Sequence, residues 1–216
     1  PGKGDITNMI RSYIHRCQKD GVKIVMNCEV TPELVKEEKP DSVIIATGSK
    51  TLILPIEGID DPAIIHGSDL LDGKRGAGKK VLVVGGGMVG CETAAFLGEQ
   101  EHDVTVIEFR DTVGADVIHE HRVYLMKDFE DYGIKEITGA KVCRFYEDGV
   151  EYETADGVRH ETRGYDSVIL SMGFRNYNPL EEQIKDIVDT HVIGDAIRAR
   201  RALDATKEAY EVASRI

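Results

Sequence analysis

Hydrophobic residues recur along the chain with two spacings, one typical of amphipathic helices and one of buried strands. Apolar side chains between Ile6 and Lys19 lie three or four positions apart, which predicts a helix that ends at Asp20-Gly21. Short runs of consecutive apolar residues predict buried strands. The predicted strands are 22–26, 42–47, 80–84, 104–108, 166–172 and 191–193.

Helical segments separate these apolar runs, and this alternation indicates a parallel sheet. The predicted helices are 31–38, 88–101, 116–132 and one that starts near 202. Two turn dipeptides, Asp148-Gly149 and Asp156-Gly157, divide residues 140–162 into short segments, which predicts a small antiparallel meander. The expected fold class is therefore α/β, with a Rossmann-like parallel sheet and an antiparallel meander.

Residues 51–80 are rich in glycine and also contain prolines, which is typical of a connector between two substructures. We therefore expect a domain boundary near Lys74. The length of 216 residues is compatible with one large domain or with two smaller interleaved ones.

Composition narrows the classes of function. Hydrophobic residues make up 41% of the chain and charged residues 31%, as in ordinary globular proteins. The net charge of −12 disfavours nucleic acid as a partner, and no apolar run approaches the ~20 residues of a membrane span. The four cysteines show no disulfide or metal spacing, which favours a cytoplasmic location. No pattern indicates an oligomeric state.

The most informative motif follows the predicted strand 80–84. It consists of Gly85, Gly86, Gly87, Met88, Val89 and Gly90. Gly85 permits a tight turn, Gly87 lets a pyrophosphate approach, and Gly90 lets the next helix pack on the strand. N–H groups at the start of that helix would bind the pyrophosphate. The glycine spacing alone is weak evidence, but its strand, turn, helix and strand context predicts a nicotinamide dinucleotide site.

Glu108 stands at the end of the second strand of this unit. A carboxylate there can accept hydrogen bonds from both adenosine ribose hydroxyls, and it repels a ribose phosphate. NADH is therefore favoured over NADPH, although Arg110 could contact a 2′-phosphate. The alternative is that Glu108 is only a solvated strand end. For Glu92, compensation of the helix dipole and a role near the nicotinamide both stay open.

Other candidate chemistry is weaker. His119 and His121 would point to different sides of a helix, so we interpret them as exposed histidines rather than metal ligands. Cys91 is predicted to be a small packing residue against the sheet. The cluster of Arg198, Arg200 and Arg201 is interpreted as a solvated turn or the entry to the last helix. No catalytic residue and no metal site are predicted.

Three further segments flank the glycine turn in a recognisable order: SVIIATG at 42–48, SMG at 171–173 and VIGD at 192–195. Together with the glycine turn they resemble the C-terminal region of the 2,4-dienoyl-CoA reductase and trimethylamine dehydrogenase family of NADH:flavin oxidoreductases, which are pyridine nucleotide-disulfide oxidoreductase-like. The resemblance covers nearly the whole chain. It implies an NAD(P)H-binding Rossmann domain, 74–173, inserted into a partial FAD or ADP domain made of 1–73 and 174–216.

The resemblance also implies roles for single residues. Thr47 and Gly48 would form the strand-end crossover beside a flavin dinucleotide. Asp195, which follows Gly194, would face the ribityl chain or the corresponding ribose, and a helix N-cap is the alternative for Asp195. Gly173, where the strand of the SMG segment ends, is counted with the cofactor-binding residues.

One part of the family pattern is missing from this chain. The first strand and glycine turn of the flavin domain do not precede Pro1. Family members also carry an N-terminal barrel with FMN and an iron-sulfur cluster, and neither the length nor the cysteines for it occur here. The resemblance therefore implies a fragment whose partner is the missing N-terminal flavin barrel of the same polypeptide, with FMN and the cluster expected only there.

In the intact enzyme, NADH would pass hydride to a flavin, and the electrons would continue to an enoyl-type or amine substrate. The fragment alone is expected to be inactive. Two alternatives stay open: a fragment of a disulfide reductase or NADH oxidase-type flavoprotein, and a non-catalytic NADH-binding module.

Overall fold

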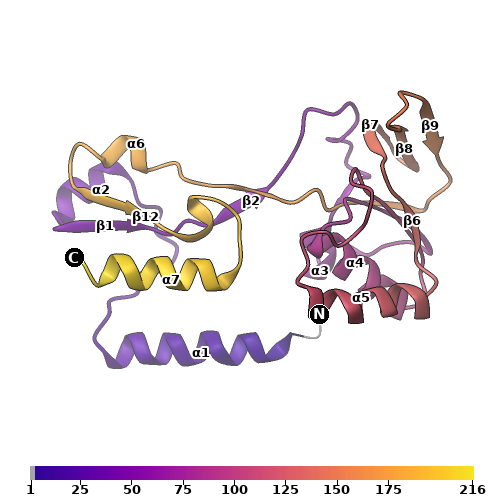
Figure 1. The fold of residues 1–216 in the computed structure, drawn as a ribbon. Coiled ribbons are helices and arrows are strands. Elements are labelled where there is room, and N and C mark those ends of the chain that lie inside the picture. Colours follow the sequence, from indigo (N-terminus) through magenta and orange to yellow (C-terminus); the bar gives the residue numbers. More distant parts are fainter. Residues whose placement is uncertain (1–2) are drawn as a thin grey trace. The chain divides into compact units, whose positions relative to one another are not determined.

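The computed structural model describes residues 3–216 and divides the chain into two compact units (Figure 1). The terminal unit consists of Pro1–Lys50 with Phe174–Ile216, and the inserted unit is Thr51–Gly173. The chain therefore leaves the terminal unit once and returns to it, so that the inserted unit is continuous in sequence and the terminal unit is not.

A five-stranded parallel sheet forms the centre of the inserted unit, with the strand order β3-β10-β4-β5-β6. The strands are β3 (Ile65–His66), β10 (Ser167–Leu170), β4 (Lys80–Val84), β5 (Asp103–Ile107) and β6 (Lys135–Ile137). All four residues of β10 are buried, as are the last four of β4. This burial on both faces explains why these strands are continuous apolar runs in the sequence.

Alternate residues of β4 face two different cores. Val81 and Val83 pack with helices α3 (Gly67–Leu71), α4 (Met88–Glu99) and α5 (His119–Asp131). Leu82 and Val84 pack on the opposite face against an antiparallel meander of three strands, β7 (Lys141–Tyr146), β8 (Gly149–Glu153) and β9 (Arg159–Thr162). Figure 1 shows α4 and α5 on one side of this unit and the meander on the other.

The terminal unit has a small core around a two-stranded parallel sheet of β1 (Ser42–Ile45) and β12 (Asp189–Val192). Its helices are α1 (Gly4–Lys19), α2 (Pro32–Glu38), α6 (Glu181–Ile184), the 3-10 turn η1 (Gly194–Ala196) and α7 (Ala202–Ala213). The core residues are Val35, Ile45, Leu180, Ile184 and Ala196. A second pair of strands, β2 (Ser49–Thr51) and β11 (Phe174–Asn176), lies where the chain leaves and re-enters this unit.

The predicted fold class is confirmed: parallel strands alternate with helices along the chain, and the meander lies within the predicted residues 140–162. The predicted strand at 22–26 is wrong, because these residues form no strand. Their side chains are exposed, with Met26 reaching 76%. A strand requires a neighbouring strand that accepts and donates its backbone hydrogen bonds. In the described part of the terminal unit, β1 pairs with β12 and β2 with β11, and residues 22–26 pair with none of these strands.

The inserted unit begins after Lys50, earlier than the predicted boundary near Lys74. Residues beyond Lys50 belong to its core, because Ile59 and Ile64 pack in the cluster that contains Leu82. Strand β3 then joins the parallel sheet beside β10. The glycine-rich and proline-containing stretch is thus a packed edge of the inserted unit rather than a connector.

No helix in the described part of the chain, residues 3–216, is both long and apolar enough to span a membrane.

Candidate functional site

The glycine turn follows β4 directly and joins it to α4. Gly85 has a φ of +104°, a left-handed conformation that favours glycine. Its N–H donates to the Ile107 carbonyl at 2.9 Å, and a Cβ here would overlap the Ser171 carbonyl oxygen. The turn is therefore closed between β5 on one side and the end of β10 on the other.

Gly90 lies in the first turn of α4 and faces the glycine turn. A Cβ at this position would overlap the carbonyl oxygen of Gly85. The predicted packing role of Gly90 is confirmed, since only a residue without a side chain lets α4 approach the end of β4 this closely.

Two acidic side chains lie close to the middle glycines of the turn, Gly86 and Gly87. A Cβ on Gly86 would lie 2.9 Å from Cβ of Glu108, and one on Gly87 would lie 3.3 Å from Oδ2 of Asp116. Glycine at both positions leaves room for these neighbours. Approach of a pyrophosphate to Gly87 stays a prediction.

Glu108 is half-buried and holds backbone groups with both carboxylate oxygens. Oε2 accepts the Gly86 N–H at 2.6 Å, and Oε1 accepts the Arg110 N–H at 3.0 Å. Glu108 is therefore not merely a solvated strand end: its carboxylate is oriented at the turn. Its recognition of a ribose stays a prediction.

Asp116 is not among the site residues predicted from the sequence, yet it lies at the glycine turn. Its Oδ1 accepts the Met88 N–H at 2.9 Å. Met88 is the first residue of α4, so Asp116 caps the helix that the pyrophosphate is expected to approach. The two residues are 28 positions apart in sequence, and no local motif links them.

Cys91 and Glu92 lie side by side in the first turns of α4 but in different surroundings. Cys91 is fully buried, as predicted for a packing residue, and its Sγ donates to the Gly86 carbonyl at 3.2 Å. Burial raises the pKa of this thiol to about 12. Glu92 Oε1 lies 3.9 Å from Nε2 of His121 on α5, an arrangement that leaves both predicted roles of Glu92 open.

In the terminal unit, the residues after β1 are held by the chain that follows β11. The Thr47 hydroxyl donates to the Tyr177 carbonyl, and the Gly48 carbonyl accepts the Tyr177 N–H at 2.9 Å. Gly48 has a φ of +75°, which is the left-handed region. In the inserted unit, the carbonyl of Gly173 accepts the Leu52 N–H at 2.9 Å.

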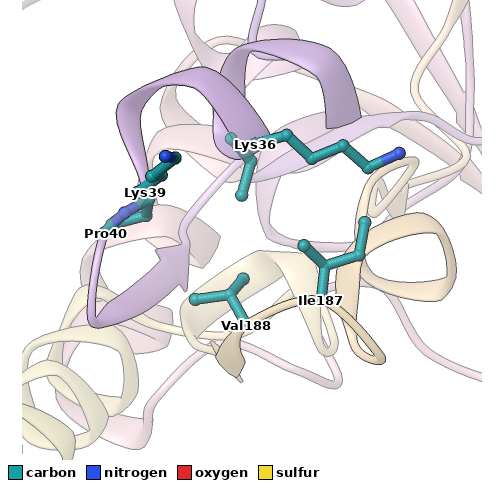
Figure 2. A pocket seen from close by; sticks show the side chains of 6 residues that line it. Lys36, Lys39, Pro40, Ile187 and Val188 are labelled. Carbon is teal, nitrogen blue, oxygen red and sulfur yellow. The ribbon is translucent and has the colours of Figure 1, made fainter.

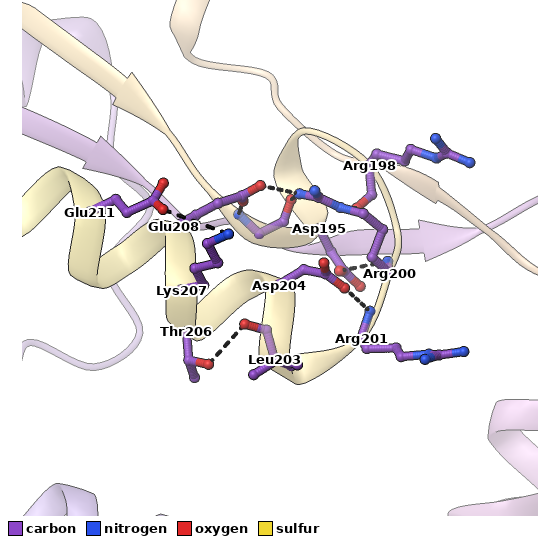
Figure 3. A network of polar contacts seen from close by, with 11 residues as sticks. Asp195, Arg198, Arg200, Arg201, Leu203, Asp204, Thr206, Lys207, Glu208 and Glu211 are labelled. Atoms are coloured by element: carbon purple, nitrogen blue, oxygen red, sulfur yellow. Dashed lines mark hydrogen bonds and ion pairs between the residues drawn. The ribbon is translucent and has the colours of Figure 1, made fainter. Parts of the chain in front are cut away.

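Asp195 and Glu208 belong to a polar network around the start of α7 (Figure 3). The Gly194 N–H donates to Glu208 Oε2 at 2.8 Å, and Arg200 Nη2 lies 2.6 Å from Glu208 Oε1. These two contacts lower the pKa of Glu208, with the Gly194 N–H making the larger contribution. Arg200 is thus held in an intramolecular ion pair with Glu208.

Asp195 accepts two hydrogen bonds within the terminal unit. Oδ1 accepts the Arg200 N–H at 3.0 Å, and Oδ2 accepts the Ser49 hydroxyl at 3.4 Å. The alternative interpretation of Asp195 as a helix N-cap is wrong, because α7 starts at Ala202 and has Arg201 as its N-cap. The structure places Thr47, Gly48, Gly194 and Asp195 in the terminal unit, and Gly173 and the glycine turn in the inserted unit.

A shallow pocket in the terminal unit contains none of the predicted site residues (Figure 2). Val35, Pro40, Ile187 and Val188 form its apolar lining, with Lys36 and Lys39 beside them. Among residues 3–216, no group of three or more histidine, cysteine or acidic side chains could hold a metal ion.

Comparisons with known proteins support the resemblance. A family model described as pyridine nucleotide-disulphide oxidoreductase matches residues 4–191. Cinnamate reductase of Clostridium sporogenes is 29% identical over 218 residues, which is 99% of this chain and 32% of that protein. NADH oxidase of Thermoanaerobacter brockii is 31% identical over 223 residues, which is 100% of this chain and 34% of that protein.

Among solved structures, 2-naphthoyl-CoA reductase in complex with 2-naphthoyl-CoA is similar, with 30% identity and a TM-score of 0.87. The match covers 98% of this chain and 32% of that one. The chain spans about a third of the length of these relatives. These matches confirm the resemblance inferred from the sequence.

Proposed function

Because this chain belongs to the pyridine nucleotide-disulphide oxidoreductase family, we propose that it is the nicotinamide dinucleotide-binding part of a flavin-dependent reductase. The inserted unit is the NAD(P)H domain, and the terminal unit is a partial FAD or ADP domain. NADH supplies a hydride, and a flavin accepts it for transfer to an enoyl-type or amine substrate. Similarity to cinnamate reductase and 2-naphthoyl-CoA reductase favours the enoyl-type substrate.

The orientation of the Glu108 carboxylate is the observation that carries this proposal. Its two oxygens are oriented by the N–H groups of Gly86 and Arg110. A carboxylate oxygen has more than one acceptor position, so each oxygen can also accept a ribose hydroxyl. A 2′-phosphate at the same place would meet a negative charge at close range, which favours NADH over NADPH.

The donor set of the inserted unit fits a dinucleotide. The turn from Gly85 to Gly90 has no side chain at four of its six positions, and it opens a helix of 12 residues whose first N–H groups attract anions. The backbone of this turn would hold the pyrophosphate, and Glu108 would orient the adenosine ribose. The chain's contribution is binding and orientation, so none of its residues has to act as an acid, base or nucleophile.

The terminal unit offers a smaller donor set for a flavin dinucleotide. Thr47, Gly48 and Asp195 would contact it, and these residues supply hydroxyl, backbone and carboxylate groups. Gly194 would contribute backbone, but its N–H already donates to Glu208. The remaining contacts, together with FMN and an iron-sulfur cluster, would come from an N-terminal flavin barrel of a longer polypeptide. All four cysteines are free thiols, which supports a cytoplasmic location.

Calorimetric titration of the 216-residue chain with NADH and NADPH tests the proposal. We expect NADH to bind more tightly, and Glu108→Gln to reduce the preference for NADH by about tenfold. Glu99→Gln is the matched control, because it removes the same charge at the exposed opposite end of α4. Binding of neither nucleotide by a folded chain would refute the proposal.

Similarity to an NADH oxidase favours one second candidate, an oxidase-type flavoprotein. An absorbance spectrum of the purified chain and of the longer polypeptide separates a flavoenzyme from a non-catalytic NADH-binding module. Bound flavin in the longer polypeptide supports a flavoenzyme, and oxygen consumption with NADH supports the oxidase. NADH binding without flavin in either protein favours a non-catalytic module.

A further inference from the structure

The carboxylate of Asp116 lies at the N-terminus of α4, where an anionic ligand would bind. Asp116 Oδ1 accepts the Met88 N–H at 2.9 Å, and Oδ2 lies 3.3 Å from where a Cβ of Gly87 would be. The proposed function places a pyrophosphate against these groups, and the inference below rests on that function. The side of Gly87 toward which the pyrophosphate would move is therefore faced by a negative charge.

The loop that carries Asp116 is attached firmly to the glycine turn. Gly114 donates its N–H to the Gly86 carbonyl at 2.7 Å, and the Val113 side chain is buried against the same turn. The Arg122 guanidinium donates to the Val113 carbonyl at 3.1 Å and to the Thr112 hydroxyl at 2.9 Å. The loop backbone is thus held from two sides, by the turn and by α5.

Asp116 itself is exposed, unlike Val113 and Val117 beside it. Rotation about its two side-chain bonds would release the Met88 N–H without moving the loop backbone. The released N–H could then donate to a phosphate oxygen.

We infer that Asp116 is an internal anion of the dinucleotide site, which holds the Met88 N–H when no ligand is bound and is displaced by the pyrophosphate. The backbone of Met88 has one N–H, so a phosphate oxygen that accepts it competes with Asp116 for the same donor. The carboxylate then stays near the phosphates and repels them. Asp116 therefore weakens binding of ligands with a diphosphate and leaves binding of uncharged adenosine unaffected.

The test is Asp116→Asn in the 216-residue chain. Asparagine keeps an oxygen acceptor for the Met88 N–H but removes the charge, so the helix cap is preserved. We expect NADH to bind about tenfold more tightly to this variant at low ionic strength, because a like charge near the phosphates is gone. The gain should shrink in about 0.5 M salt, which screens such repulsion.

Two controls separate this effect from a general change of charge or stability. Glu130→Gln removes the same charge near the C-terminal end of α5. This end of α5 lies at the far end of α4 from the glycine turn, because Tyr132 packs against Gly98. The Glu130→Gln variant should bind NADH like the wild type. Adenosine, which has no phosphate, should bind equally to all three proteins. Asp116→Ser provides a second uncharged variant if the asparagine variant folds poorly.

The outcomes distinguish this inference from the proposed function. Wild-type binding of NADH with equal or weaker binding by folded Asp116→Asn would overturn the inference and leave the proposed function intact. Failure of NADH to bind any of the folded proteins would overturn both. Tighter binding that does not depend on salt would also contradict a role of charge.

Discussion

Glu108 and Gly86 are joined by a hydrogen bond of 2.6 Å, from the backbone N–H of Gly86 to the carboxylate at the end of β5. This bond links the two strand ends that a Rossmann site uses, the glycine turn after β4 and the acidic residue after β5. The carboxylate thus has a structural role in addition to the proposed recognition of ribose.

The structural role predicts a loss of stability when Glu108 is shortened. Glu108→Ala leaves the N–H groups of Gly86 and Arg110 without their acceptor, so we expect the free energy of unfolding to fall by about 1 to 3 kcal/mol. Glu108→Gln retains one acceptor oxygen and should lose less. Urea denaturation followed by circular dichroism measures both, and equal stability of wild type and Glu108→Ala would contradict the bond.

A methyl group at Gly90 should disrupt the packing of α4 on the glycine turn. The Cβ of Gly90→Ala would overlap the Gly85 carbonyl oxygen, which is backbone and cannot turn aside. We expect a loss of about 3 kcal/mol or more in unfolding free energy, together with loss of nucleotide binding. Gly76→Ala is the control, because nothing lies within 4 Å of its Cβ position. Similar denaturation midpoints for the two variants would disprove the close approach.

Glu208 should make the terminal unit sensitive to acid. The Gly194 N–H and the Arg200 guanidinium lower the pKa of Glu208 below its ordinary value of 4.5. The fold therefore favours the ionised carboxylate, and this stabilisation is present above pH 4.5 and is lost as pH falls through the lowered pKa.

Thermal unfolding of wild type and Glu208→Gln between about pH 6 and pH 3 tests this dependence. The stability difference between the two proteins should be largest at the upper pH and should disappear at the lower one. Glu211→Gln on the same helix serves as the control, since Glu211 forms only a 3.9 Å ion pair with Lys207. A difference that is constant with pH would refute the prediction.

Cys91 should be chemically inert in the folded protein. Burial removes it from solvent and raises the pKa of its thiol to about 12, so almost no thiolate is present at pH 8. Labelling with iodoacetamide followed by peptide mass mapping should modify exposed Cys28 rapidly and Cys91 only after urea is added. Equal labelling rates for the two cysteines in the native protein would show that the glycine turn opens readily.

The sequence alone determined the elements whose signal is local. The glycine spacing after β4, the apolar runs of β4 and β10 and the turn dipeptides of the meander each depend on residues within a few positions of one another. Backbone conformation and burial on both faces of a strand follow from such short-range patterns. For this reason the α/β class, the glycine turn and the position of Glu108 at the end of a strand could be predicted.

Contacts between residues far apart in the chain could not be predicted from the sequence, because they depend on how the chain folds. Apolar residues at 22–26 form no strand, because a ladder partner cannot be inferred from the run itself. Ile59 and Ile64 belong to the inserted unit because they pack against Leu82, which glycine and proline content does not reveal. Asp116 reaches Met88 through the fold of a loop between β5 and α5, since a side chain can cap any helix that packing brings within hydrogen-bond distance.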